Sequence, residues 1–172
     1  SLQSNYSTAS VSVNYQINST DLKKLKYDSI DITENSKNSF DVYFQLFDPV
    51  NNTLLTQSSV TTIELDDNRS IRLNLEASFN NPILWEPDNP KLYLVKSIVS
   101  RNGMIVDEIS YKIGIRDLKI NNKSFYLNGR TFELKGINYV EDFPNYGSAI
   151  DYESIEKDIR NLKNLGVNII NV

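Results

Sequence analysis

The chain has 172 residues, 40% of them hydrophobic and 23% charged, with a formal net charge of −4, and this size accommodates one complete domain and part of a second. It has no cysteine and no histidine, which excludes disulfides, thiolate nucleophiles, histidine triads and metal centres built on these residues. The sequence has no run of basic residues that would predict nucleic-acid binding. It also has no apolar run that approaches the roughly 20 residues of a membrane span.

Residues 10–116 alternate apolar and polar side chains, which is typical of antiparallel strands with one face toward a core. The alternation is clear at residues 11–17 and 71–75, whereas residues 40–47 carry large apolar groups on both faces, including Tyr43 and Phe47. The second pattern predicts a strand that is covered on both sides.

Two longer strands are predicted at residues 92–99 and 105–115, with the turn residues Arg101-Asn102-Gly103 between them. A second turn is predicted at residues 48–52, Asp-Pro-Val-Asn-Asn. About seven strands in roughly 105 residues are typical of an immunoglobulin-like β-sandwich.

After Arg116 the pattern changes. Asn128-Gly129 separates two apolar runs and predicts a tight β-hairpin, because such turns need two residues that tolerate positive φ. Residues 134–138 then predict a short buried strand, and residues 139–150 a polar, aromatic loop.

A helix is predicted from Asp151, a suitable N-cap, to Gly166, a suitable terminator. Its apolar face carries Ile155, Ile159 and Leu162 at helical spacing. Residues 167–172 predict another strand, so residues 134–172 form a parallel strand-helix-strand crossover. Two parallel strands and one helix cannot cover both sheet faces, so we expect the rest of a parallel domain to complete this unit.

Five short motifs carry a resemblance to a known family. In the order of the chain, they are Leu84-Trp85-Glu86-Pro87 continuing to Leu92-Tyr93, Gly114-Ile115-Arg116, residues 125–134, residues 136–144 and residues 162–168. The same motifs occur in the same order in family 2 glycoside hydrolases, the β-galactosidase, β-glucuronidase and β-mannosidase group. The chain resembles this family over residues 83–170.

The resemblance implies a mainly β fold: an immunoglobulin-like antiparallel β-sandwich at residues 1–117, then a β-hairpin and one β-α-β unit of an incomplete TIM barrel at residues 118–172. It also implies retaining hydrolysis of β-glycosides by two glutamates on later barrel strands, beyond Val172. We therefore expect no catalytic residue here. The chain is interpreted as an inactive accessory scaffold whose partners are the remainder of its own barrel and, in the full-length protein, a carbohydrate.

Site residues follow from the same resemblance. Asn138, Tyr139, Glu141 and Asp142 correspond to the loop that borders the sugar pocket; their alternative role is a strand-end cap and solvated loop carboxylates. Structural roles are assigned to three residues: Trp85, Arg116 and Gly129. Trp85 is interpreted as a packing residue rather than a sugar platform, and Arg116 as a pairing residue at the joint between sandwich and barrel.

Two departures from the family pattern keep alternatives open. Val140 stands where the family has a histidine, and Asn171 where it has an arginine, so a barrel pseudoenzyme is one alternative. The other is a carbohydrate-binding or adhesin-like sandwich, which an exposed line of aromatic residues would favour. No cofactor, metal, nucleic acid or membrane span is expected, and an extracytoplasmic location is favoured over a cytoplasmic one.

Overall fold

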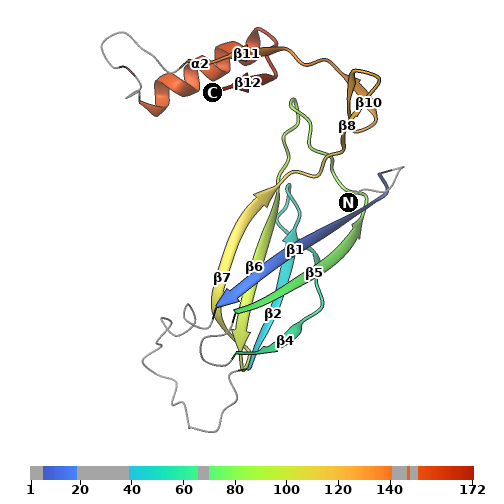
Figure 1. Cartoon of the computed structure of the whole chain (residues 1–172), viewed down its shortest axis with the longest axis vertical. Coiled ribbons are helices and arrows are strands. Elements are labelled where there is room, and N and C mark those ends of the chain that lie inside the picture. Colours follow the sequence, from blue (N-terminus) through green and yellow to red (C-terminus); the bar gives the residue numbers. More distant parts are fainter. Residues whose placement is uncertain (1–5, 19–38, 66–69, 141–146, 148–150) are drawn as a thin grey trace. The chain divides into compact units, whose positions relative to one another are not determined.

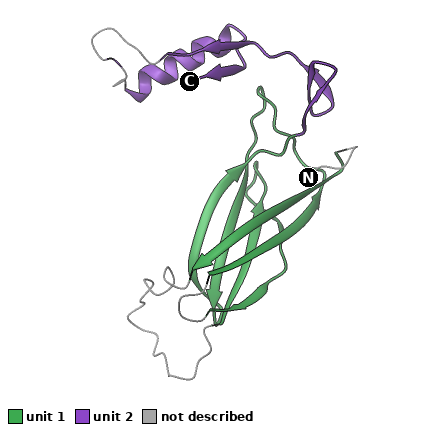
Figure 2. Ribbon diagram, in the orientation of Figure 1, with its two compact units in different colours: residues 1–116 green, residues 117–172 purple. Residues whose placement is uncertain are grey.

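The computed structural model describes residues 6–18, 39–65, 70–140, 147 and 151–172. The chain divides into two compact units, Ser1–Arg116 (unit 1) and Asp117–Val172 (unit 2), shown in Figure 2. Among the described residues, no helix has the length and apolar character needed to cross a membrane.

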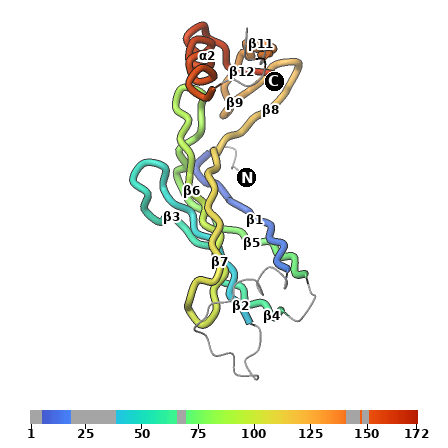
Figure 3. The backbone as a smooth tube through the Cα atoms, turned by 90° about the vertical axis from the view of Figure 1, so that its left-hand side faces the viewer, coloured from blue at the N-terminus to red at the C-terminus, as the bar shows by residue number. Residues whose placement is uncertain are grey.

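Unit 1 is an antiparallel β-sandwich. One layer pairs β1 with β5, and the other has the strand order β3-β2-β6-β7, with β4 also pairing with β2. In Figure 1, β1 and β5 cross in front of the second layer, and Figure 3 shows these two strands running together. The described strands are β1 (Thr8–Asn18), β2 (Ser39–Phe47), β3 (Leu54–Gln57), β4 (Thr61–Glu64), β5 (Ser70–Asn80), β6 (Tyr93–Arg101) and β7 (Met104–Ile113). The predicted mainly β sandwich is confirmed.

The core of unit 1 lies between the two layers, and the period of two in β2 explains how it forms. Val42, Phe44 and Leu46 on one face of this central strand are 0% exposed. The opposite face, with Tyr43 and Phe47, is only half-buried, so the predicted cover on both sides of this strand is incomplete. The other members of the cluster come from β1, β2, β4, β5 and β6 and from the residue after β4: Ala9, Val11, Ile17, Phe40, Ile63, Leu65, Leu75, Ala77, Phe79, Tyr93, Val95 and Val99.

The turns of unit 1 form where the sequence predicts them. Asp48 Oδ1 accepts hydrogen bonds from the main-chain N–H groups of Val50 and Asn51, at 2.8 and 3.0 Å. Between β6 and β7, Asn102 and Gly103 have φ values of 52° and 78°, as a tight hairpin with the strand twist requires.

Unit 2 begins with a small antiparallel sheet in the order β10-β9-β8. The predicted hairpin joins β9 (Ser124–Leu127) to β10 (Arg130–Phe132), with positive φ at Asn128 (52°) and Gly129 (76°). A third strand, β8 (Leu118–Asn121), was not predicted. It has only four residues, all of them exposed, and its alternation of Leu118 and Ile120 with polar residues is too short to define a strand by itself.

The chain then forms β11 (Gly136–Asn138), α2 (Tyr152–Asn164) and β12 (Ile169–Asn171), and the two strands pair in parallel. Asp151 caps the start of α2. At its end, Gly166, with φ 84°, and Val167 donate main-chain hydrogen bonds to earlier carbonyls, as in a Schellman motif.

The strand-helix-strand crossover is therefore present, but the predicted burial of β11 is wrong. Gly136 and Asn138 are exposed, and only Ile137 is half-buried. The helix has no buried residue either. The described part of the chain supplies too few apolar neighbours to cover this short sheet.

Candidate functional site

The carboxyl ends of β11 and β12 bring two amide side chains together. Asn138 and Asn171 are register partners, and Asn171 Nδ2 donates a hydrogen bond to Asn138 Oδ1 at 3.1 Å. Both residues are exposed, so the pair keeps further donor and acceptor capacity for a ligand. Sequence reasoning singled out both positions but did not predict their mutual contact.

Tyr139 fixes the chain just after β11. Its main-chain N–H donates to the carbonyl oxygen of Asn171 at 2.8 Å, and its hydroxyl donates to Asp158 Oδ2 of α2 at 3.1 Å. The residue is half-buried. Its phenol thus links the strand end to the helix, a contact that constrains how far the ring can swing toward a sugar.

Asp158 is a residue of this site that sequence reasoning missed, although a signal existed. It follows Ile155 by three positions and precedes Leu162 by four, so it lies within the apolar stripe of the helix. A carboxylate in such a stripe needs a hydrogen-bonding partner when neighbouring groups cover it, and Tyr139 provides one.

The opposite ends of the two strands are held by Asn168. Its Oδ1 accepts from the main-chain N–H of Lys135 at 2.9 Å, and its Nδ2 donates to the carbonyl oxygen of Glu133 at 2.8 Å. A main-chain bond from Asn168 N to Lys135 O, 3.0 Å long, closes the contact. These bonds fix the register that places Asn138 beside Asn171.

Glu141 and Asp142, the two carboxylates predicted for the pocket loop, lie outside the described residues. Val140, which precedes them, is 74% exposed. Among the described residues, no cluster of three or more acidic side chains has a geometry suited to a metal ion.

Trp85 and Arg116 contact each other within unit 1. The Arg116 guanidinium lies 5.1 Å from the centre of the indole ring, a favourable cation–π distance. Trp85 also donates its main-chain N–H to Ile115 at 2.7 Å, and a Cβ added at Gly114 would be 3.0 Å from two indole carbons. The half-buried indole is therefore enclosed on several sides by its own unit.

The Asn-Gly turn at Gly129 does more than reverse the chain. Asn128 is buried, at 7% exposure; its Oδ1 accepts from Asp117 N at 3.0 Å, and its own N–H donates to Asp117 O at 2.7 Å. This reciprocal pair ties the hairpin to the first residue of unit 2. The sequence indicated the turn but not the tie.

The whole arrangement can be compared with known proteins. Residues 2–116 match the model of glycosyl hydrolases family 2, and residues 118–171 match the model of the TIM barrel domain of the same family. The chain belongs to glycosyl hydrolases family 2. The family 2 resemblance inferred from the five motifs is thereby confirmed, as is the start of a TIM barrel domain.

Curated family 2 relatives are much longer than this chain. A β-galactosidase of Staphylococcus xylosus is 28% identical over 137 residues, which are 80% of this chain and 12% of the relative. A β-galactosidase of Thermoanaerobacterium thermosulfurigenes is 32% identical over 137 residues, 79% of this chain and 17% of the relative. The chain thus spans less than a fifth of either enzyme.

Solved structures show the same fold. A family 2 glycosyl hydrolase from Bacteroides cellulosilyticus DSM 14838 superimposes with a TM-score of 0.78 at 24% identity, covering 95% of this chain and 21% of that one. A β-glucuronidase from Bacteroides uniformis gives a TM-score of 0.76 at 22% identity, covering 96% and 18%. These likenesses support the sandwich and the first barrel unit of family 2.

Proposed function

We propose that the full-length family 2 protein hydrolyses β-glycosides with retention, and that this chain supplies an accessory sandwich domain (residues 1–117) and the start of the catalytic barrel (residues 118–172). The observation that carries the proposal is the family match over both units. The parallel pairing of β11 and β12 supports it, since barrel enzymes place their sites at the carboxyl ends of such strands.

The chemistry requires two carboxyl groups about 5 to 5.5 Å apart, one a nucleophile and the other a general acid and base. The family resemblance assigns both to glutamates on later barrel strands. The 172 residues of this chain have a positioning role for the sugar, because they begin the barrel and form part of its pocket rim. The chain alone is therefore expected to be inactive.

Within the pocket rim, Asn138 is the residue we assign to direct hydrogen bonding with sugar hydroxyls. Glu141 and Asp142 border the same pocket by resemblance. Tyr139 belongs to this rim as well, and its bond to Asp158 favours a positioning role for it. Trp85, Arg116 and Gly129 are proposed to be structural.

The binding partner of unit 2 is the remainder of its own barrel. The half-exposed Ile159 (39%) and Ile169 (45%) present apolar surface that further barrel strands and helices would bury. The proposed ligand is a carbohydrate rather than a nucleic acid, in line with a net charge of −4. An extracytoplasmic location is favoured for such an enzyme.

The test is a hydrolysis assay of the full-length protein against a panel of nitrophenyl β-glycosides. We expect turnover of at least one member, with retained anomeric configuration by NMR, and no turnover by the 172-residue chain. Absence of hydrolysis across the panel would favour the pseudoenzyme instead.

The role of Asn138 has its own test in the same assay. Asn138→Ala removes a hydrogen bond to the sugar, so kcat/KM should fall by about tenfold, on the order of 1 to 2 kcal/mol. Asn161→Ala, on the exposed surface of α2, is the matched control and should leave kcat/KM unchanged. Equal effects of the two substitutions would refute the assignment of Asn138.

A further inference from the structure

The outward face of the β1–β5 layer carries an unbroken row of polar side chains. Its opposite face packs on the core, so alternate residues point to solvent. The outward residues are Thr8, Ser10, Ser12, Asn14, Gln16 and Asn18 on β1, and Ser70, Arg72, Asn74, Glu76, Ser78 and Asn80 on β5. None of these described residues is aromatic, so they do not form the line of exposed aromatics that would favour a stacking carbohydrate module.

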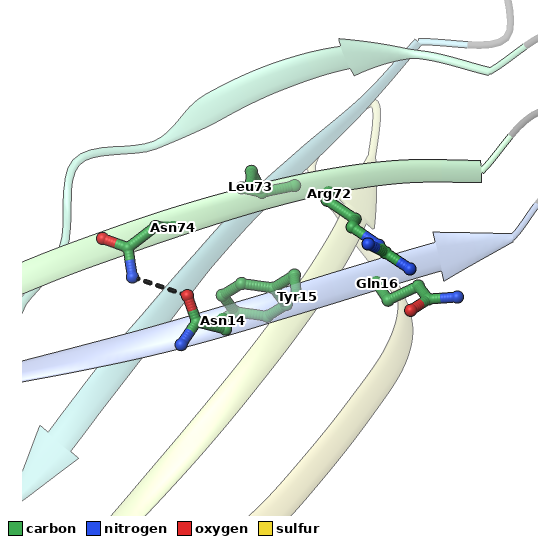
Figure 4. A pocket seen from close by; sticks show the side chains of 6 residues that line it. All are labelled: Asn14, Tyr15, Gln16, Arg72, Leu73 and Asn74. Carbon is green, nitrogen blue, oxygen red and sulfur yellow. Dashed lines mark hydrogen bonds between the residues drawn. The ribbon is translucent and has the colours of Figure 1, made fainter.

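A hollow of about 550 Å³ lies on this face (Figure 4). It is lined by three consecutive register pairs: Asn14 with Asn74, Tyr15 with Leu73, and Gln16 with Arg72. The side chains of the middle pair pack against the core, so this pair forms the floor. The outer two pairs form polar walls, and Figure 4 shows Arg72 reaching from β5 toward Gln16 on β1.

Hydrogen bonds within the face hold one wall in place. Asn74 Nδ2 donates to Ser12 Oγ at 2.6 Å and to Asn14 Oδ1 at 2.8 Å. Both N–H groups of Asn74 are thus used, which leaves its Oδ1 as an acceptor and the Asn14 amide nitrogen as a donor. That wall therefore presents one defined acceptor and two defined N–H donors to the hollow.

The floor is anchored in the core. The Tyr15 hydroxyl donates to the carbonyl oxygen of Tyr43 at 3.3 Å, which connects β1 to the other layer of the sandwich. Burial raises the pKa of Tyr15, although a hydrogen bond with Ser97 partly offsets this effect. The hollow therefore rests on two strands whose spacing is already fixed, and a ligand would not have to order them.

The other wall supplies the charge. Among the described residues, neither Gln16 nor Arg72 hydrogen-bonds or ion-pairs with another side chain. No carboxylate is among the described residues that line the hollow. The acidic residue of the same strand face, Glu76, is four positions along β5, roughly 13 Å from Arg72 at strand spacing. The hollow is thus rich in N–H donors and carries one planar cation, the geometry that favours an oxyanion.

We propose that this hollow binds an oxyanion-bearing glycan, with a carboxylate or sulfate group on Arg72 and ring hydroxyls on Asn14, Gln16 and Asn74. A neutral sugar lacks the group that Arg72 recognises, and the ring of Tyr15, the aromatic residue of the lining, packs against the core and is bonded through its hydroxyl to Tyr43. A nucleic acid requires several cations along its backbone, whereas this face offers one. Because the hollow is exposed, binding is weak, on the order of millimolar for one sugar unit, and a polymer gains through repeated attachment.

The test uses the 15N-labelled 172-residue chain and four probes: an oligogalacturonate, a sulfated galactan oligosaccharide, a neutral galactan oligosaccharide and polyglutamate. Amide shifts of residues 14–16 and 72–74 should move with an anionic glycan. The carboxylated and sulfated probes show which oxyanion fits. No shift with either one, or equal shifts with polyglutamate or the neutral glycan, overturns the proposal.

Variants then assign the effect to Arg72. Arg72→Gln should lower affinity for the anionic glycan at least fivefold, and Arg72→Lys should lower it less, because a lysine keeps the charge but loses the planar two-point contact. Arg130→Gln, an exposed arginine of β10 in unit 2, makes the same change of charge away from the hollow. Equal losses in Arg72→Gln and Arg130→Gln would overturn the proposal. The outcome is independent of whether the full-length protein hydrolyses glycosides.

Discussion

The two units respond differently to similar sequence patterns. In unit 1 the apolar face of β2 is fully buried, with Phe44 and Leu46 at 0% exposure. In unit 2 the helix α2 has an equally regular apolar stripe, yet none of its residues is buried. Leu127 is the one buried hydrophobic residue that the described part of unit 2 contributes. Local pattern therefore determines the element, whereas its burial depends on how many neighbours surround it.

The largest expected difference between the units is in how much a leucine-to-alanine substitution lowers the free energy of unfolding. Leu46→Ala leaves a cavity between the two layers and should lower the free energy of unfolding of unit 1 by about 2 to 5 kcal/mol. Leu165→Ala changes a side chain that is 79% exposed, so the stability of unit 2 should change by less than about 0.5 kcal/mol. Native-state hydrogen exchange, followed separately on amides of β2 and α2, measures both. Similar losses in the two units would mean that Leu165, the C-cap residue of α2, is already well packed.

A longer chain sharpens the same comparison. In the 172-residue chain, Ile159→Ala should cost less than about 1 kcal/mol, because the side chain is 39% exposed. In a chain that contains the whole barrel, the same substitution should cost about 2 to 4 kcal/mol, since the stripe is then buried. Urea unfolding of both chains measures the difference. An equal cost in the two chains would contradict a barrel partner for this face.

Much of the fold was predictable because its signals are local. The alternation around Phe44, the turn at Asn102-Gly103 and the cap at Asp151 each depend on a few neighbouring residues, and each was found. β8 was missed because its alternation of Leu118 and Ile120 with Lys119 and Asn121 covers only four residues, which is short for a strand signal. The turn after it, at Asn122-Lys123, has positive φ at both residues but no glycine to signal it.

The candidate site was predictable only in outline. Asn138 and Asn171 were singled out through the family resemblance, Asn138 in the pocket loop and Asn171 in the place of an arginine, but their hydrogen bond joins residues 33 positions apart. The bond between Tyr139 and Asp158 has the same origin, because a loop and a helix bring them together. Contacts of this kind depend on how far each strand extends and on the parallel register, which short sequence motifs do not specify.

The two units can also be compared through glycines at which an added methyl group would meet a neighbouring side chain, Gly114 in unit 1 and Gly136 in unit 2. Gly114→Ala places a methyl group 3.0 Å from the Trp85 ring. Arg116 already lies over this ring, and the main-chain N–H of Trp85 is bonded to the Ile115 carbonyl oxygen. The cost should be about 1 to 3 kcal/mol, and the emission of this single tryptophan should shift.

The same change in unit 2 should cost less. Gly136→Ala places a methyl group 2.6 Å from Ile169 Cγ2, but Ile169 is 45% exposed and can turn toward solvent, at roughly 1 kcal/mol or less. Hydrogen exchange of β12 amides measures it. A larger loss of stability for Gly136→Ala than for Gly114→Ala would show that the distance to the neighbouring atom determines the cost, rather than how tightly the neighbouring side chain is enclosed.

The smallest effect concerns the cap of α2 and its pH dependence. The main-chain N–H and the hydroxyl of Ser154 donate to Asp151 at 2.8 and 2.9 Å, and these bonds lower the pKa of Asp151 below its ordinary value. A lowered pKa in the folded state means that the ionised carboxylate stabilises the helix. This contribution is present above the ordinary aspartate range and is lost as the pH falls through the lowered pKa.

The Ser154 amide resonance should therefore shift with a midpoint below the ordinary aspartate value. Asp151→Asn keeps an oxygen acceptor without a titrating group, so its Ser154 resonance should stay constant over the same pH range. A midpoint at or above the ordinary value would mean that Ser154 does not favour the ionised cap.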